Sequence, residues 1–164
     1  MIASLLIAAA LQSAAAPAHV PPPIPATACT AEVPPPAGFG AWRSITAATA
    51  GPIAIGARTG VKLAPAAATH FVIAPERKPA EGSLAGVYHV TVTTPGTYRI
   101  ALDGAAWIDL VRDGAALPST AHTMGPACTG IRKIVDFALV PGDYALQLSG
   151  VRDKALTVLI VPAR

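Results

Sequence analysis

The side chains that could bind a transition metal are scattered along the chain. A mononuclear non-haem iron site needs two histidines and one carboxylate that converge on the ion. Here His70, His89 or His122 would have to meet Asp109 or Asp136 through tertiary contacts, with His89, His122 and Asp136 as the preferred set. None of these histidines has a second ligand at the spacing of a local motif. We therefore expect separate structural or surface histidines and no cofactor, with iron as the alternative.

Trp107 and Asp109 share one face of an expected strand. An aromatic ring beside an acid is how many β-sandwich modules hold sugars, by stacking and by hydrogen bonds to hydroxyl groups. The alternative is that Trp107 fills the core while Asp109 caps a loop. The sequence shows no second aromatic residue close by, which favours this alternative.

Arg132 and Lys133 follow Cys128 closely and form a second candidate site. Together with Arg43, which a disulfide would bring near, they could bind an anionic group. The alternative is that they are solvated charges on an edge strand, where lysine and arginine discourage association between sheets. Asp136 alternates with apolar neighbours and could pair with one of these bases.

The sequence contains no motif for the other common catalytic or nucleotide-binding sites. GxSxG, HExxH, CxxC and a phosphate-binding glycine loop are all absent, and a Ser119, His122 and Asp109 trio has no diagnostic spacing. The net charge of +3 is dispersed and aromatic residues make up 5%, so we expect no nucleic-acid binding. Composition and motifs together favour a non-catalytic protein.

The elements that carry these residues read as strands. Turn dipeptides such as Pro95-Gly96 and Pro141-Gly142 separate short alternating segments, and no segment has a convincing helical period. Seventeen prolines and 14 glycines also disfavour a helical bundle. The sequence predicts an all-β domain, an antiparallel β-sandwich of jelly-roll type. The expected strands are Ile53–Arg58, Val61–Leu63, Thr69–Ala74, Val87–Thr93, Thr97–Leu102, Ala106–Arg112, Arg132–Leu139, Asp143–Leu148 and Ala155–Val161.

One turn and strand, residues 95–104, has an echo at residues 141–150. Each copy starts Pro-Gly-x-Tyr and then alternates apolar residues with polar or small ones. The strands that precede the two turns do not keep a common register. The similarity therefore indicates that the same turn and strand pattern is used twice, and is weak evidence for a duplication. Residues 155–161 are apolar on both faces apart from Thr157, which predicts a central or covered strand.

Two stretches resemble known proteins. The pattern Pro-Gly-x-Tyr-x-apolar-x-Leu-x-Gly, followed by residues 107–114, resembles the strands of secreted jelly-roll modules, such as pre-peptidase C-terminal domains and some carbohydrate-binding modules. Residues 121–137 resemble small exported bacterial proteins of unestablished role, some carrying the name homogentisate 1,2-dioxygenase. That name implies iron-dependent oxygenation. A second histidine stands in those proteins where this chain has Met124, which weakens a metal site in this loop.

The N-terminal part of the chain predicts export. Residues 1–16 carry no charged side chain, and their apolar run is too short to span a bilayer. Small residues at 14–18 offer signal-peptidase patterns, so we assign residues 1–18 to a signal peptide. Residues 19–40, rich in proline, are expected to be an extended tether, with a proline-rich recognition ligand as the alternative.

Cys29 and Cys128 are the two cysteines of the chain. In an exported protein the simplest expectation is one disulfide that fastens the tether to the domain of residues 41–164. The alternative is a pair of free or metal-binding thiols.

These observations combine into one functional hypothesis. We expect a periplasmic or secreted β-sandwich with a binding or envelope-associated role, no membrane span after signal cleavage, and an envelope glycan or protein as its partner. An iron-dependent dioxygenase and a carbohydrate-binding accessory module are the alternatives. A module that binds a protein should expose an apolar sheet face beside residues 155–161.

Overall fold

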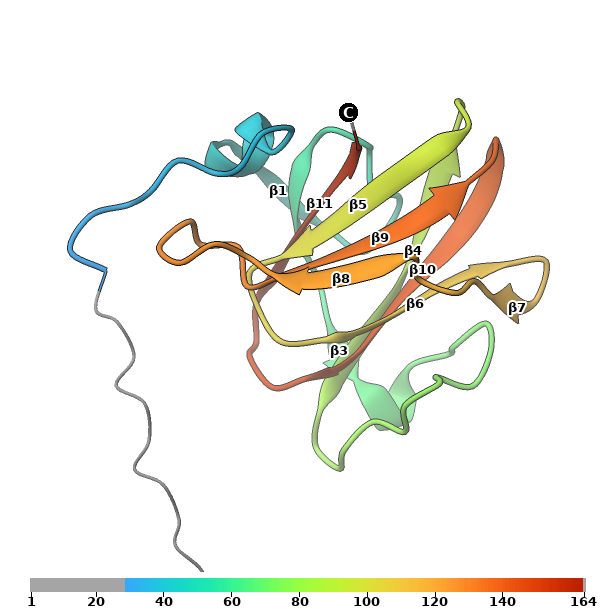
Figure 1. The fold of residues 1–164 in the computed structure, drawn as a ribbon. Coiled ribbons are helices and arrows are strands. Elements are labelled where there is room, and N and C mark those ends of the chain that lie inside the picture. The colour runs from blue at the N-terminus through green and yellow to red at the C-terminus, as the bar shows by residue number, and fades with distance from the viewer. Residues whose placement is uncertain (1–28, 164) are drawn as a thin grey trace, which may run out of the picture.

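The computed structural model describes residues 29–163, apart from the side chains of residues 45–47. Within these residues two sheets pack against each other, and helix is confined to two short 3-10 turns (Figure 1). The predicted β-sandwich is therefore confirmed. The expected signal peptide and the first part of the expected tether lie outside the described residues. No helix in residues 29–163 is long and apolar enough to cross a membrane.

The larger sheet has six strands in the order β1-β2-β11-β5-β9-β8. Within the described residues only β1 and β2 run parallel, and the other neighbours are antiparallel. The bounds are Ile45–Thr49 (β1), Arg58–Val61 (β2), Gly96–Leu102 (β5), Ala121–Met124 (β8), Lys133–Leu139 (β9) and Leu156–Pro162 (β11). β11 lies inside the sheet, which confirms the central strand predicted from its two apolar faces.

The smaller sheet has five strands in the order β3-β4-β10-β6-β7. Its bounds are Ala64–Pro65 (β3), Leu84–Val92 (β4), Trp107–Arg112 (β6), Ala115–Ala116 (β7) and Gly142–Val151 (β10). The two 3-10 turns are η1, Gly40–Arg43, and η2, Ala66–Ala68. Every second residue of the long strands points inward, so side chains such as Ile100, Leu110, Phe137 and Leu146 meet in one core between the sheets.

The outer face of the larger sheet has an apolar cover. Phe39 and Trp42 are buried to 0% and 2% exposure, and they pack with Leu159 and Val161 of β11. The predicted disulfide between Cys29 and Cys128 is present and fastens this N-terminal segment to the loop before β9. The backbone N–H of Val33 also donates to the carbonyl of Cys128 at 2.9 Å.

This cover changes two expectations. Phe39 belongs to the expected tether of residues 19–40, yet it is fully buried, so the folded unit begins before residue 41. The apolar face beside residues 155–161, which a protein-binding module was expected to expose, is occupied by the chain's own η1 segment.

The strand prediction was right for the six longer segments from β4 to β11 and wrong at weaker ones. Residues 53–57 and 69–74 contain no strand. In the first segment Ile53 and Ile55 pack against the core without forming a strand, and in the second Val72 is exposed. β8 was missed because all four of its residues are exposed and carry no alternating apolar pattern. His122 lies on this edge strand.

Candidate ligand-binding cleft

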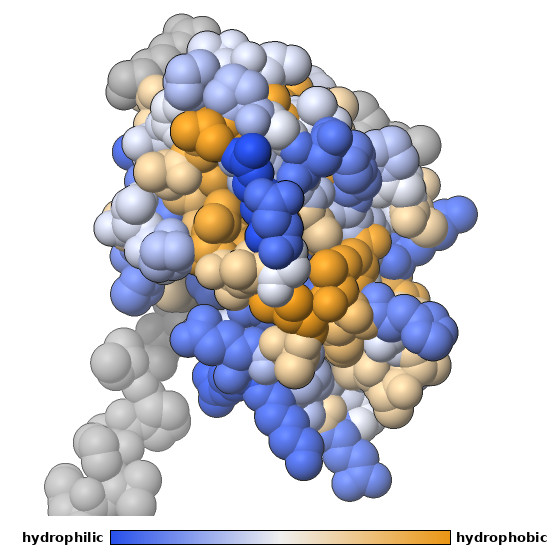
Figure 2. All heavy atoms as spheres, turned by 90° about the vertical axis from the view of Figure 1, so that its right-hand side faces the viewer, coloured by the Kyte–Doolittle hydropathy of each residue, from blue (hydrophilic) through white to orange (hydrophobic). Residues whose placement is uncertain are grey.

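Part of the outer face of the smaller sheet, around Gln147, is covered by the segment between η2 and β4, residues 69–83. Gln147 of β10 is fully buried beneath it. Its Oε1 accepts hydrogen bonds from the N–H groups of Val72 and Ile73 at 2.6 and 3.2 Å, and its Nε2 donates to the Ile73 carbonyl at 3.2 Å. The sheet and its cover thus enclose a layer of polar side chains. In Figure 2 hydrophilic side chains project at the lower end of the molecule, where this segment lies in Figure 1.

Trp107 and Asp109 occupy this layer on one face of β6, opposite Ser149 and Gln147 of β10. The indole Nε1 of Trp107 donates to Asp109 Oδ1 at 2.9 Å. Asp109 is only 3% exposed, and its other oxygen, Oδ2, is buried with no hydrogen-bond partner in the described part of the chain. A buried carboxylate oxygen has lost its water and is stabilised only by a new donor. Oδ2 is therefore a buried acceptor whose hydrogen-bonding capacity the described residues leave unused.

Lys133 reaches the same place from the other sheet. It begins β9, and β9 lies between β5 and β8. Its Nζ donates to the carbonyl of Ala106 at 3.1 Å and lies 5.5 Å from the centre of the Trp107 ring, within the range of a cation–π contact. Burial lowers the pKa of the Lys133 ammonium below its usual value. Lys133 is thus a positioned cation, and its interpretation as a solvated edge-strand charge is wrong.

A cleft of about 370 Å³ opens between β6 of the smaller sheet and β8 and β9 of the larger one. These strands lie one above another in the centre of Figure 1. Because β7 pairs only with Val111 and Arg112, the first half of β6 is a free sheet edge, and the cleft follows it. We call it the edge cleft. Its floor is apolar, and its polar lining consists of Glu76, Trp107, Asp109, Ser119, His122 and Lys133.

The positions of Trp107 and Asp109 differ from those that the core-and-cap alternative expected. Trp107 is half-buried and belongs to neither apolar cluster, so it does not fill the core. Asp109 accepts from its own strand and caps no loop. The expected pair is therefore adjacent, as predicted, and Lys133 joins it.

Ser119, His122 and Asp109 all line the edge cleft, but they do not form a catalytic arrangement. No hydrogen bond joins any two of them in the described residues, and Asp109 Oδ1 is already held by Trp107. A nucleophile needs a base within hydrogen-bond reach, and that base needs an orienting partner. The side chains are better placed to bind than to transfer an acyl group.

The expected iron ligands are not brought together. His89 lies on the exposed face of β4, with its Nε2 3.3 Å from Asp143 Oδ1, whereas His122 lies on β8 of the other sheet. Asp136 pairs with Arg99 at 3.6 Å, not with Arg132 or Lys133. Within residues 29–163 no three His, Cys, Asp or Glu side chains form a group that could hold a metal ion. The donor set therefore does not fit a non-haem iron.

Several residues of the region carry no sequence signal. Glu76 and Ser119 line the edge cleft from irregular segments, and Ser149 stands among the ordinary alternating residues of β10. Arg132 lines a second cleft beside Lys133, whereas Arg43 lies in η1 and lines neither cleft. Only the pairing of β6 with β10 and the fold of the cover place these residues together.

The chain matches no protein-family model, no curated protein and no solved structure. Its function is therefore inferred from the edge cleft and the chemistry of the residues that line it.

Proposed function

We propose that this protein is an exported, non-catalytic binding module and that the edge cleft binds a small polyhydroxylated ligand, a glycan of the cell envelope. The observation that carries the proposal is Asp109 Oδ2, a buried carboxylate oxygen beside a tryptophan, which has no hydrogen-bond partner among residues 29–163. A sugar hydroxyl is a neutral donor that satisfies this oxygen without placing a second charge in the cleft.

The remaining lining suits the same ligand. The cleft volume, about 370 Å³, lies in the usual range for small-molecule sites. Lys133 donates, and Ser119 and His122 offer both donors and acceptors, which matches the mixed hydrogen-bonding of sugar hydroxyls. Because Lys133 lies over the Trp107 ring, we expect recognition to depend mainly on hydrogen bonds, with less ring stacking than the sequence suggests.

Export is supported by two features. The disulfide between Cys29 and Cys128 is of the kind that persists in oxidising compartments. The uncharged, apolar residues 1–16 have the composition of a signal peptide. Cell fractionation followed by mass spectrometry of the mature N-terminus tests this part: a cytoplasmic protein with Met1 intact contradicts it.

The binding proposal is tested by ¹⁵N NMR. The chain has two tryptophans, so two indole N–H signals are expected, and Trp107→Phe assigns them. Titration with neutral mono- and oligosaccharides at millimolar concentrations should move the Trp107 signal, since its Nε1 bonds the carboxylate that receives the ligand.

Asp109→Asn replaces the accepting oxygen and should weaken this binding at least tenfold. Asp153→Asn, in the exposed β10–β11 turn, is the matched control and should bind as the wild type does. The proposal fails if no saccharide moves the Trp107 signal, or if Asp109→Asn binds unchanged.

A further inference from the structure

A second cleft, of about 510 Å³, adjoins the edge cleft where β6 begins. Trp107 and Lys133 line both clefts, so they form a shared wall. We call this second one the basic cleft. Loops at the ends of β5, β8 and β10 surround it, together with residues 77–80 of the cover. The charged residues that line it are Arg77, Lys78, Arg132, Lys133 and Arg152.

The charge of the basic cleft is unbalanced. No aspartate or glutamate lines it, and none of its five cations forms an ion pair with a carboxylate in the described residues. The edge cleft, by contrast, contains both Glu76 and Asp109. Cations that converge from separate segments repel one another, and a bound anion removes that repulsion.

The basic cleft also has a buried polar group without a partner. Ser149 is 1% exposed, and its Oγ has no hydrogen-bond partner in the described residues. It lies opposite Trp107 across the β6–β10 pair, at the shared wall. A serine hydroxyl can donate to an oxyanion, and the donor of Ser149 is not used by the described residues.

Two of the cations are positioned by the backbone. The N–H of Arg132 donates to the Leu102 carbonyl at 2.8 Å, which places Arg132 at the mouth of the cleft. Lys133 Nζ is held on the Ala106 carbonyl. The guanidinium group of arginine, which can form two parallel hydrogen bonds, and the ammonium group of lysine are the usual protein partners of phosphate groups.

We propose that the basic cleft binds a phosphate group and that the ligand of the adjoining edge cleft is a phosphorylated glycan. The second half of this inference rests on the proposed function, whereas the anion site does not. A phosphate on a sugar and a phosphate on a lipid headgroup share this chemistry. The continuity of the two clefts at Trp107 and Lys133 favours the sugar.

The anion site is tested by NMR titration with inorganic phosphate, glucose and glucose 6-phosphate. Phosphate should shift the backbone signals of Arg132, Lys133 and Ser149, and affinity should fall as sodium chloride is raised, because salt screens exposed charges. The double variant Arg77→Gln/Arg132→Gln should weaken phosphate binding at least tenfold. Lys154→Gln, an exposed lysine outside the cleft, is the matched control and should bind as the wild type does.

The outcomes separate the two proposals. If phosphate binds the double variant as well as the wild type, or moves none of these signals, the anion site is overturned while the sugar site stands on its own titration. If phosphate binding depends on the cations but glucose 6-phosphate binds no better than inorganic phosphate, even with Asp109 intact, the phosphorylated glycan is overturned.

Vesicles distinguish the lipid source. The protein should not sediment with phosphatidylcholine vesicles, either with or without phosphatidic acid, if the phosphate belongs to a soluble glycan. Sedimentation that requires phosphatidic acid and is lost in Arg77→Gln/Arg132→Gln would overturn the glycan assignment and identify a lipid phosphate.

Discussion

Tyr98 and Tyr144 make the same hydrogen bond in opposite sheets. Each hydroxyl donates to the carbonyl four residues earlier, Tyr98 to Thr94 at 2.8 Å and Tyr144 to Val140 at 2.7 Å. Each tyrosine follows a Pro-Gly turn. Its ring is buried and its hydroxyl closes the turn, as in the tyrosine corner of other sandwiches. The echo between residues 95–104 and 141–150 is therefore a repeated turn closure.

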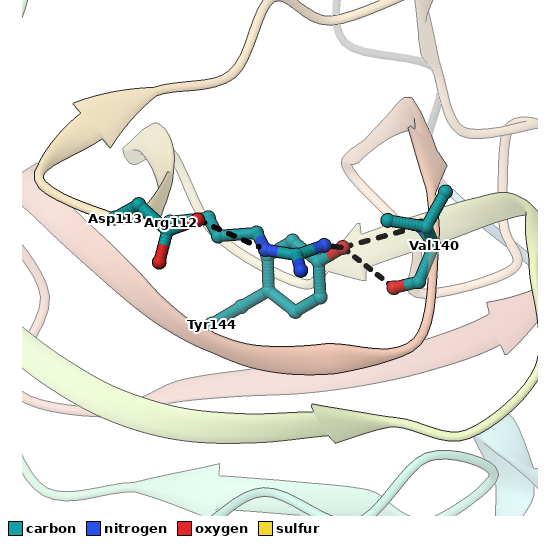
Figure 3. Close-up of polar contacts among 4 residues, drawn as sticks. All are labelled: Arg112, Asp113, Val140 and Tyr144. Atoms are coloured by element: carbon teal, nitrogen blue, oxygen red, sulfur yellow. Dashed lines mark hydrogen bonds and ion pairs between the residues drawn. The ribbon is translucent and has the colours of Figure 1, made fainter.

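The Tyr144 corner has extra partners, which Figure 3 shows. Its hydroxyl also accepts from the Val140 N–H at 3.2 Å and from Arg112 Nη1 at 3.1 Å. The guanidinium of Arg112 lies 5.4 Å from the centre of the Tyr144 ring, and its Nε is 3.3 Å from Asp113 Oδ2. This corner links β6 to the β9–β10 turn.

Replacing each corner tyrosine with phenylalanine should therefore have unequal effects. Tyr98→Phe removes one hydrogen bond and should lower the free energy of unfolding by about 1 kcal/mol. Tyr144→Phe also leaves the Val140 N–H and Arg112 without this partner and should cost about 2 kcal/mol. Urea denaturation of both variants measures the difference. An equal or larger loss for Tyr98→Phe would contradict this account of the corners.

Loss of the disulfide should destabilise the whole domain. Cys29 and Cys128 are 99 residues apart, and a closed loop of that length stabilises by about 4 to 5 kcal/mol through the lost entropy of the unfolded chain. The Cys29→Ser/Cys128→Ser variant should also release Phe39 and Trp42 from β11. Urea denaturation gives the first effect, and a red shift of tryptophan emission gives the second. An unshifted emission would mean that the cover stays in place without the bridge.

Asp109→Asn should not reduce stability even though it should weaken ligand binding at least tenfold. The substitution keeps an acceptor for Trp107 Nε1 and replaces a buried carboxyl oxygen, Oδ2, that has no hydrogen-bond partner in the described residues. We expect a free energy of unfolding equal to that of the wild type or higher by up to about 1 kcal/mol. Asp103→Asn is the contrast, because Asp103 Oδ1 accepts from the Thr157 N–H at 2.8 Å and loses a charge-assisted bond. Thermal melts of both variants check this contrast: the melting temperature of Asp103→Asn should fall, and that of Asp109→Asn should not.

Stability should fall at alkaline pH through Tyr88. Burial raises the pKa of Tyr88 from 10.0 to about 12, while its hydroxyl donates to the Lys62 carbonyl. Between these values the unfolded chain releases the proton and the folded chain keeps it, so the stabilisation present below pH 10 is lost as pH rises toward 12. The free energy of unfolding, measured by urea denaturation from pH 8 to about 11, should fall more steeply for the wild type than for Tyr88→Phe. Parallel curves would show that Tyr88 does not govern the alkaline limit.

The sequence by itself determined the strands that are long and regularly patterned. Alternation in residues 97–102 and 143–148 is decided by which side chains avoid water, and this information is local. The covered character of β11 was readable because both faces of residues 155–161 are apolar. The disulfide was readable because the chain contains two cysteines.

Only the tertiary structure decided what the candidate residues do. The register of β6 on β10 sets Asp109 opposite Gln147, which lies beneath residues 69–83. Asp109 is buried there, whereas the sequence could only put it on a strand face. Lys133 meets Trp107 across the two sheets, and the basic cleft gathers arginines from separate loops. The physical reason is that burial and cross-sheet contacts depend on long-range pairing, which local alternation and turn residues do not encode.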